Sequence, residues 1–129
     1  MAKIERFEDL ECWKKGRELT KGIYEATSSG GFAKDFGLRD QIRRSAVSVM
    51  SNIAEGFERG GDKEFRQFLA MAKGSVGELK SHLYVALDIG LLSDERFSDL
   101  YQLASESGSL IAGLMRYLSR SGFKGSKFK

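Results

Sequence analysis

The sequence of 129 residues contains no proline, a single cysteine and no long apolar run. Proline breaks helices more strongly than any other residue, so its absence favours long uninterrupted helices. Cys12 has no partner for an intrachain disulfide, and the charged residues that open the chain do not resemble a signal peptide. Without an apolar run of about 18 residues, no transmembrane helix is predicted. We therefore expect a cytoplasmic protein that makes no contact with a membrane.

Residues that carry catalytic or metal chemistry are also scarce. His82 is the one histidine, and Glu78 stands four residues before it, whereas a di-iron bundle requires two Glu-x-x-His motifs and further glutamates. Cys12 has no accompanying histidine or acid motif that would activate it as a nucleophile. The glycines of residues 56–61 follow neither the Walker pattern nor a predicted strand. We expect a structural role for His82, no catalytic residue, no metal and no cofactor.

Apolar residues recur at steps of three and four, which is the spacing of one helical face, and they predict four helices. These helices cover about residues 9–27, 38–59, 63–89 and 93–120. The residues expected to face the core are Leu10, Trp13, Leu19, Ile23 and Tyr24; Leu38, Ile42, Ala46, Val49, Ile53 and Phe57; Phe65, Leu69, Ala72, Val76, Leu79, Leu83 and Ala86; and Phe97, Tyr101, Ala104, Gly108, Ile111, Met115 and Leu118.

Glycines and capping residues predict where these helices begin and end. The expected markers are the SSGG loop at 28–31, the helix-ending Gly60 and Gly90, and the N-capping Asp62 and Ser93. Short connections place consecutive helices side by side and antiparallel. The sequence therefore predicts an all-α protein, an antiparallel up-down-up-down four-helix bundle. We expect one domain over residues 1–120, followed by a flexible basic tail at 121–129.

A polar stripe runs beside the apolar stripe of the second predicted helix. Its members are Gln41, Ser45, Ser48, Asn52, Glu55 and Arg59. One interpretation is a solvated face on which Glu55 and Arg59 form an ion pair one turn apart. The other is a face that meets another helix, from this or another subunit, because serine and asparagine are poor choices for an exposed helix interior. Interior glycines such as Gly56 and Gly74 favour close approach of a second backbone. The pattern leaves both interpretations open.

Basic residues outnumber acidic ones slightly, giving a formal net charge of +3 and a sequence pI of about 9.0. Two groups stand out: Arg39, Arg43 and Arg44 at the start of the second helix, and Arg66, Lys73 and Lys80 at intervals of seven on the third. Ordinary solubilising charge is one explanation. The other is a surface that contacts phosphates, which a ring of identical subunits would multiply.

Several ordered segments together resemble a known family. They are FEDL at 7–10 with Trp13 and Lys14, IYEAT at 23–27, FGLRDQIRRSAVS at 36–48, SNIAEG at 51–56 and FLAMAKGS at 68–75. The chain resembles the 23S ribosomal RNA intervening-sequence proteins, relatives of the accessory variability proteins of diversity-generating retroelements. One departure is Met50, which stands where many relatives carry proline, so we expect a straighter second helix here.

The resemblance implies a homo-oligomer, a barrel-like pentamer in characterised relatives, without known catalytic activity and with a basic surface that contacts structured RNA or DNA. For this chain, the expected nucleic-acid contacts are Arg39, Arg43, Arg44, Arg66, Lys73 and Lys80. The expected oligomer interface is Ser48, Asn52, Glu55, Gly56 and Arg59. The alternative function is a protein-interaction scaffold, for a partner such as a reverse transcriptase, with no direct nucleic-acid role.

Overall fold

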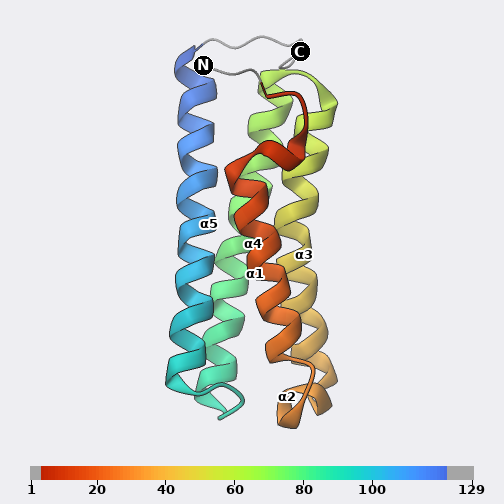
Figure 1. The fold of residues 1–129 in the computed structure, drawn as a ribbon, viewed down its shortest axis with the longest axis vertical. Helices are drawn as coiled ribbons and strands as arrows, with labels where there is room; N and C mark the ends of the chain where they lie inside the picture. The colour runs from red at the N-terminus through yellow and green to blue at the C-terminus, as the bar shows by residue number, and fades with distance from the viewer. Residues whose placement is uncertain (1–3, 122–129) are drawn as a thin grey trace.

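The computed structural model describes residues 4–121, and over that range the chain is all-helical, without a strand. The long helices are α1 (Glu11–Ala26), α3 (Phe36–Arg59), α4 (Asp62–Asp88) and α5 (Asp94–Ser121), and the short ones are η1 (Phe7–Asp9) and α2 (Gly30–Lys34). In Figure 1 the chain descends along α1, rises along α3, descends along α4 and rises along α5. The prediction of an all-α four-helix bundle is confirmed. Apart from Ser121, the predicted tail lies outside the described residues.

The long helices form a square in which each packs against two others. Helix α3 lies against α1 and α4, and α5 lies against α4 and α1. The bundle therefore has four seams: α1/α3, α3/α4, α4/α5 and α5/α1. The α1/α3 and α4/α5 seams lie on opposite sides of this square. A side chain that points toward one of them cannot share a surface with a side chain that points toward the other.

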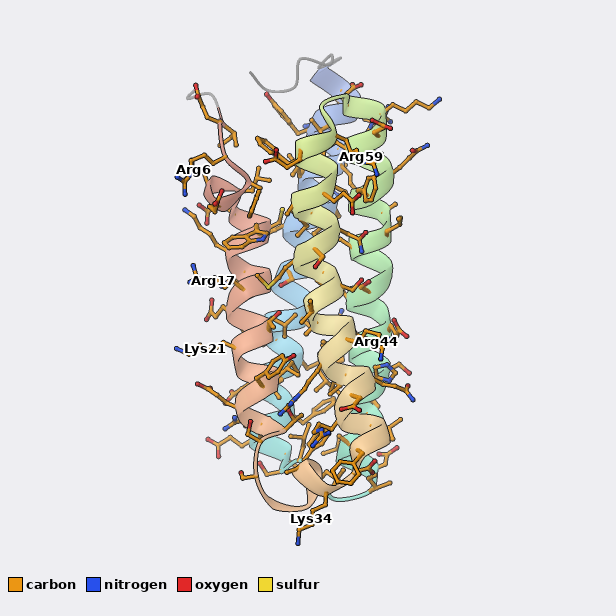
Figure 2. All side chains as sticks on the ribbon, turned by 90° about the vertical axis from the view of Figure 1, so that its right-hand side faces the viewer. Arg6, Arg17, Lys21, Lys34, Arg44 and Arg59 are labelled. Carbon is orange, nitrogen blue, oxygen red and sulfur yellow. The ribbon has the colours of Figure 1, made fainter. Side chains whose placement is uncertain are left out.

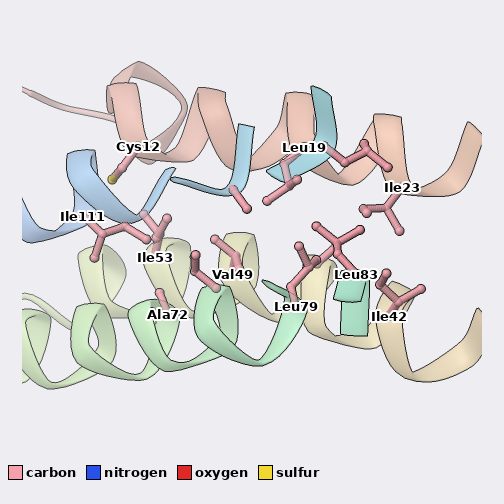
Figure 3. Packing of buried hydrophobic residues seen from close by; sticks show 14 of the residues in the cluster. Cys12, Leu19, Ile23, Ile42, Val49, Ile53, Ala72, Leu79, Leu83 and Ile111 are labelled. Carbon is pink, nitrogen blue, oxygen red and sulfur yellow. The ribbon is translucent and has the colours of Figure 1, made fainter. Parts of the chain in front are cut away.

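The core follows the predicted apolar stripes. All seven predicted residues of α4 are buried, and five of the six of α3 are buried, with Leu38 partly exposed. Figure 3 shows side chains of all four long helices meeting in the centre. Each fully buried large apolar side chain stabilises the fold by about 1.5–3 kcal/mol. The prediction that Tyr24 faces the core is wrong. Its ring is exposed rather than buried, because it lies at the edge of the α1 stripe beside Arg43.

The helix ends agree with the expected markers in part. Gly60 ends α3 with a left-handed φ of 101°, which glycine adopts without a steric penalty. The Oγ of Ser93 accepts a hydrogen bond of 3.0 Å from the backbone N–H of Arg96, as expected of an N-cap. The cap predicted at Asp62 is wrong: Gly61 occupies the N-cap position, and Asp62 is the first residue of α4. Its carboxylate still favours the positive helix end.

The predicted loop at 28–35 contains the short helix α2, whose Phe32 is buried. Asp35 follows α2, and its Oδ1 accepts a hydrogen bond of 3.1 Å from the N–H of Leu38. This cap starts α3 at Phe36, two residues before the expected start. At the other end of α1, the 3-10 turn η1 precedes the helix, so α1 begins at Glu11 rather than near Asp9.

Candidate nucleic-acid interface

Three of the predicted cations line one seam, between α4 and α5. Arg66 donates from Nη1 to the Oγ of Ser119 over 3.3 Å, and the Nζ of Lys80 lies 5.0 Å from the ring centroid of Tyr101. Lys73 is midway between them in sequence and is exposed. Residues seven apart stay on the same side of a helix. The three cations therefore form a row of about 21 Å, at 1.5 Å per residue.

The upper half of this seam contains no acidic residue. Segments 65–77 of α4 and 107–121 of α5 lack aspartate and glutamate altogether, and these halves pack together because Gly108 lies against Val76. The nearest acids of α4 face elsewhere. Glu64 lies 3.9 Å from Arg59 of α3, and Glu78 lies 3.8 Å from His82 on its own helix. The phosphate-attracting field of Arg66 and Lys73 is therefore not cancelled by an acidic residue in this half of the seam.

Arg66 is held in this seam with hydrogen-bonding capacity to spare. Its side chain is half-buried, its Nε is buried, and Nε has no hydrogen-bond partner among the described residues. A guanidinium carries five N–H donors, and a neutral hydroxyl such as that of Ser119 uses one of them. An anion at the surface of the seam would provide the charge-assisted bonds that Arg66 lacks. Lys73 likewise has no ion-pair partner within residues 4–121.

The arginines of α3 have different surroundings. The Nε of Arg43 donates to Thr27 Oγ1 over 2.8 Å, and its guanidinium carbon lies 4.4 Å from the Tyr24 ring centroid. Its Nη2 also donates to the carbonyl oxygen of Thr27 and to the hydroxyl of Ser28. Arg43 therefore fastens α3 to the end of α1. Since this is the α1/α3 seam, Arg43 lies on the opposite side of the bundle from Arg66.

Arg39 and Arg44 complete the α3 group. Arg39 pairs with Asp40 over 3.1 Å and donates to the carbonyl oxygen of Ala33 over 3.1 Å, so it holds the short helix α2 in place. Arg44 is exposed and has no ion-pair or hydrogen-bond partner among the residues that the structure describes; Figure 2 shows it projecting from α3. The structure therefore does not bring the six predicted cations together. It separates Arg66, Lys73 and Lys80 from the α3 group.

The polar stripe of α3 meets another helix, and that helix is α4 of the same chain. The Oγ of Ser75 on α4 donates to Ser48 Oγ over 3.0 Å, and Asn52 Nδ2 donates to Ser48 Oγ over 3.0 Å. Ser45 is buried, and a Cβ on Gly56 would lie 2.6 Å from Phe68 Cβ. Ser48 and Gly56 therefore meet α4 within the same chain, and the helix-contact interpretation holds for these two residues.

Glu55 and Arg59 continue the same stripe on the outside of the bundle. Arg59 Nη2 lies 2.9 Å from Glu55 Oε2, and both side chains are about half exposed. The carboxylate of Glu55 raises the pKa of Arg59 by its hydrogen bond and its charge. The solvated-face interpretation describes these two residues. Of the five residues predicted for the oligomer interface, these two are exposed, Ser48 and Asn52 are partly exposed, and Gly56 is buried.

The candidates for chemistry are buried or isolated. Burial raises the pKa of the Cys12 thiol to about 12, which keeps it protonated and a poor nucleophile at neutral pH. The Nε2 of His82 is buried, without a hydrogen-bond partner in the described part of the chain. Within residues 4–121 no three His, Cys, Asp or Glu side chains gather in a way that could hold a metal. No helix there is long and apolar enough to cross a bilayer.

Tyr84 belongs to the α4/α5 seam, although the sequence did not single it out, and α5 adds two further exposed cations. Arg116 and Arg120 are exposed on α5 one turn apart, and Tyr84 contacts Tyr101 across the seam. Tyr84 carries a weak sequence signal, since it follows Lys80 by one helical turn. Because Ser119 accepts a hydrogen bond from Arg66, Arg116 and Arg120 lie at the level of the upper end of the cation row.

Comparison with known proteins places this fold among relatives. No curated protein matches the chain. A solved structure of a protein with unknown function from the S23 ribosomal protein family of Bacteroides thetaiotaomicron VPI-5482 is similar, with 20% sequence identity and a TM-score of 0.76 over 81% of this chain and 95% of the other. The sequence model described as 23S rRNA-intervening sequence protein matches residues 8–113. Because that match spans most of the sequence, the chain belongs to the 23S rRNA-intervening sequence protein family.

Proposed function

We propose that this protein is a non-enzymatic, homo-oligomeric bundle that binds structured nucleic acid along the α4/α5 seam. The observation that carries the proposal is the row of Arg66, Lys73 and Lys80 on a face whose upper half has no acidic residue. Arg116 and Arg120 add exposed positive charge on the neighbouring helix α5. The name of the family, which refers to sequences that interrupt 23S rRNA, points to RNA as the first ligand class to test.

The side chains of this row are of the types that bind phosphate groups. Lysine and arginine side chains bind phosphate oxygens without reading bases, so they fix position rather than sequence. The flexible Lys73 and Lys80 suit successive phosphates, and the half-buried Arg66 offers directed donors. Helical RNA is recognised largely by its shape and its backbone. Structured RNA or an RNA-containing duplex is therefore the proposed ligand, and assembly would place several copies of the row on one particle.

The test is fluorescence anisotropy of a labelled RNA hairpin and a matched DNA duplex, titrated at several salt concentrations. The variant is Lys73→Glu, and the matched control is Lys21→Glu, which makes the same charge change on the outer face of α1 (Figure 2). We expect Lys73→Glu to weaken binding and to reduce the slope of log affinity against log salt by about 1. Lys21→Glu should leave that slope nearly unchanged.

Two results would overturn this proposal. One is the absence of binding at low salt by correctly folded wild-type protein. The other is an equal loss of affinity in both variants, because it would show that net charge matters and the seam does not. Circular dichroism of each variant, compared with wild type, establishes that folding is intact.

Self-assembly forms the second part of the proposal. Met71 and Val85 of α4 and Ile89, which directly follows it, are exposed apolar residues. Met71 and Val85 are two heptads apart, so they share a face. A helix surface of this kind fits contact with another protein surface. Glu55 and Arg59 on α3 are also open. We propose that these residues contribute to contacts between copies, with five copies of the 14.4 kDa chain giving about 72 kDa.

The same apolar residues favour the second candidate function, a scaffold that presents its surface to a protein partner such as a reverse transcriptase. Multi-angle light scattering separates the two uses. A defined oligomer whose mass falls in a Met71→Ser, Ile89→Ser variant assigns the face to self-assembly. A monomer in both wild type and variant leaves the face for a different protein and contradicts the proposed oligomer.

A further inference from the structure

Three aromatic rings gather where the row of cations ends, near the lower end of α4 and α5. The ring centroid of Tyr84 lies 5.0 Å from that of Phe97 and 5.5 Å from that of Tyr101. Phe97 and Tyr101 lie 5.3 Å apart. These distances are typical of aromatic pairs that stabilise one another. The cluster therefore holds its rings in defined orientations.

Core packing explains two of these rings but not the third. Phe97 and Tyr101 belong to the apolar stripe of α5 and pack against the core. The core positions of α4 at this level are Leu83 and Ala86, both fully buried. Tyr84 lies outside that stripe and is 49% exposed. At a solvent-exposed helix position, lysine and glutamate have a higher helix propensity than tyrosine. The half-exposed ring of Tyr84 therefore indicates a role other than core packing.

Toward Lys80, the surroundings of Tyr84 suit a nucleotide, whereas Asp88 follows the ring by one turn on the other side. Lys80 is one helical turn before Tyr84, and its Nζ lies 5.0 Å from the Tyr101 ring centroid. Gly77 precedes Lys80 on α4, and a Cβ built on it would meet no atom within 4 Å. A cation, an accessible ring and unoccupied space beside them are the components of a site for a phosphate and a base. A tyrosine ring is uncharged at neutral pH, and the side-chain interaction with Tyr101 raises the pKa of Tyr84 further.

We infer that Tyr84, supported by Tyr101 and Phe97, is a stacking platform for unpaired bases of the nucleic acid whose phosphates the α4 row binds. The inference rests on the proposed function and adds a preference to it. Bases inside a duplex are already stacked and cannot reach a protein ring, whereas bases in loops, bulges and single strands can. The preferred ligand is thus structured RNA with unpaired nucleotides next to a helical segment. Stacking depends little on base identity, so the platform selects strandedness rather than sequence.

The experiment compares two labelled probes at one low salt concentration: single-stranded oligo(U) of about 12 nucleotides, within the span of known single-strand sites, and a blunt RNA duplex of the same length. The variants are Tyr84→Ala and Tyr84→Phe, with Tyr24→Ala as the control, which removes an exposed ring beside Arg43 on the opposite side of the bundle. We expect Tyr84→Ala to weaken oligo(U) binding about 5- to 100-fold and to change duplex binding less than about twofold. Tyr84→Phe keeps the ring and should retain wild-type affinity.

The outcomes separate the platform from the proposed function. If Tyr84→Ala binds oligo(U) like wild type while Lys73→Glu still weakens binding, Tyr84 is not a stacking platform. The proposed phosphate contacts of the α4 cations would then be unaffected. An equal loss for both probes also overturns the platform, because duplex binding does not use it. If wild-type protein binds neither probe, the proposed function itself fails. A changed oligomer mass in Tyr84→Ala would assign the ring to an interface between copies and overturn the inference.

Discussion

Gly56 of α3 and Phe68 of α4 approach so closely that a Cβ on Gly56 would lie 2.6 Å from Phe68 Cβ, a distance that real structures avoid. Phe68 Cβ is attached directly to the backbone of α4, so it cannot move aside without moving the helix. The glycine thus sets the separation of α3 and α4 at this level. The small residues of the α3 stripe serve this close intramolecular contact.

Gly56→Ala is the first prediction. We expect this substitution to destabilise the fold by about 1–3 kcal/mol, the usual range for overpacking, despite the better helix propensity of alanine. The measurement is urea unfolding followed by circular dichroism at 222 nm, the usual wavelength for helices. Gly74→Ala is the matched control, because a Cβ there would meet no atom within 4 Å. It should stabilise the fold by up to about 1 kcal/mol. Equal stability of Gly56→Ala and wild type would show that α3 and α4 can move apart here at little cost in free energy.

Arg43→Ala carries the second prediction. The hydroxyl of buried Thr27 donates to the carbonyl oxygen of Ile23 and accepts from Arg43 Nε. Removing the guanidinium leaves that acceptor unsatisfied and frees the end of α1. We expect a loss of about 1.5–3 kcal/mol in unfolding free energy, as for hydrogen bonds to charged groups.

Arg44→Ala is the control for this prediction. Arg44 has the same side chain one residue later, is exposed and has no hydrogen-bond or ion-pair partner in the described part of the chain. Its removal should change the unfolding free energy by less than about 0.5 kcal/mol. Chemical denaturation of both variants measures the difference. Similar stabilities would contradict the assignment of Arg43 as the tether between α3 and α1.

The sequence correctly predicts most of the residues that share a buried helical face. The seven-residue spacing of the α4 stripe from Phe65 to Ala86 predicted every buried apolar position of that helix. Local capping was harder. Asp35 and Asp62 both precede or begin helices, and either can act as a cap, but the backbone conformation decided that Asp35 caps and Asp62 does not.

The sequence does not predict which helix a given face meets. Arg43 and Arg66 both stand beside apolar stripes, yet Arg43 bonds to a residue 16 positions earlier and Arg66 to one 53 positions later. Those partners follow from the order of helices around the square and from their register. For that reason the sequence proposed all six cations as nucleic-acid contacts, whereas the structure places Arg43 and Arg66 on opposite sides of the bundle. The sequence did not single out Tyr84 for the same reason, because its partners Phe97 and Tyr101 belong to the next helix.

The third prediction concerns assembly and uses Glu55→Ala. Glu55 is exposed, and its ion-pair partner among the described residues is Arg59, one turn away on the same helix. Isolated surface pairs contribute little to folding, so we expect the urea midpoint to change little. If the pair faces a neighbouring subunit, the mass measured by light scattering should fall. Asn52→Leu is a poorer probe, because Asn52 also bonds to Ser48 inside the α3/α4 seam. An unchanged mass in Glu55→Ala would remove this pair from the interface.

The fourth prediction is a pH dependence that comes from Cys12. The side chain is 3% exposed, and burial raises its pKa from 9.0 to about 12. Above pH 9 the unfolded chain releases the thiol proton while the folded chain keeps it, so the unfolded state binds fewer protons. Stability therefore falls as the pH rises between about 9 and 12, by up to about 1.4 kcal/mol per pH unit.

Other groups titrate in the same range, so the variant Cys12→Ala isolates this effect. Alanine lowers the stability at every pH because it leaves space in the buried core, but it removes the titrating thiol. We expect wild-type unfolding free energy, measured with urea from neutral pH to about pH 11, to fall more steeply than that of Cys12→Ala above pH 9. Parallel curves would mean that the thiolate forms inside the folded protein, which requires α1 to open toward water at Cys12.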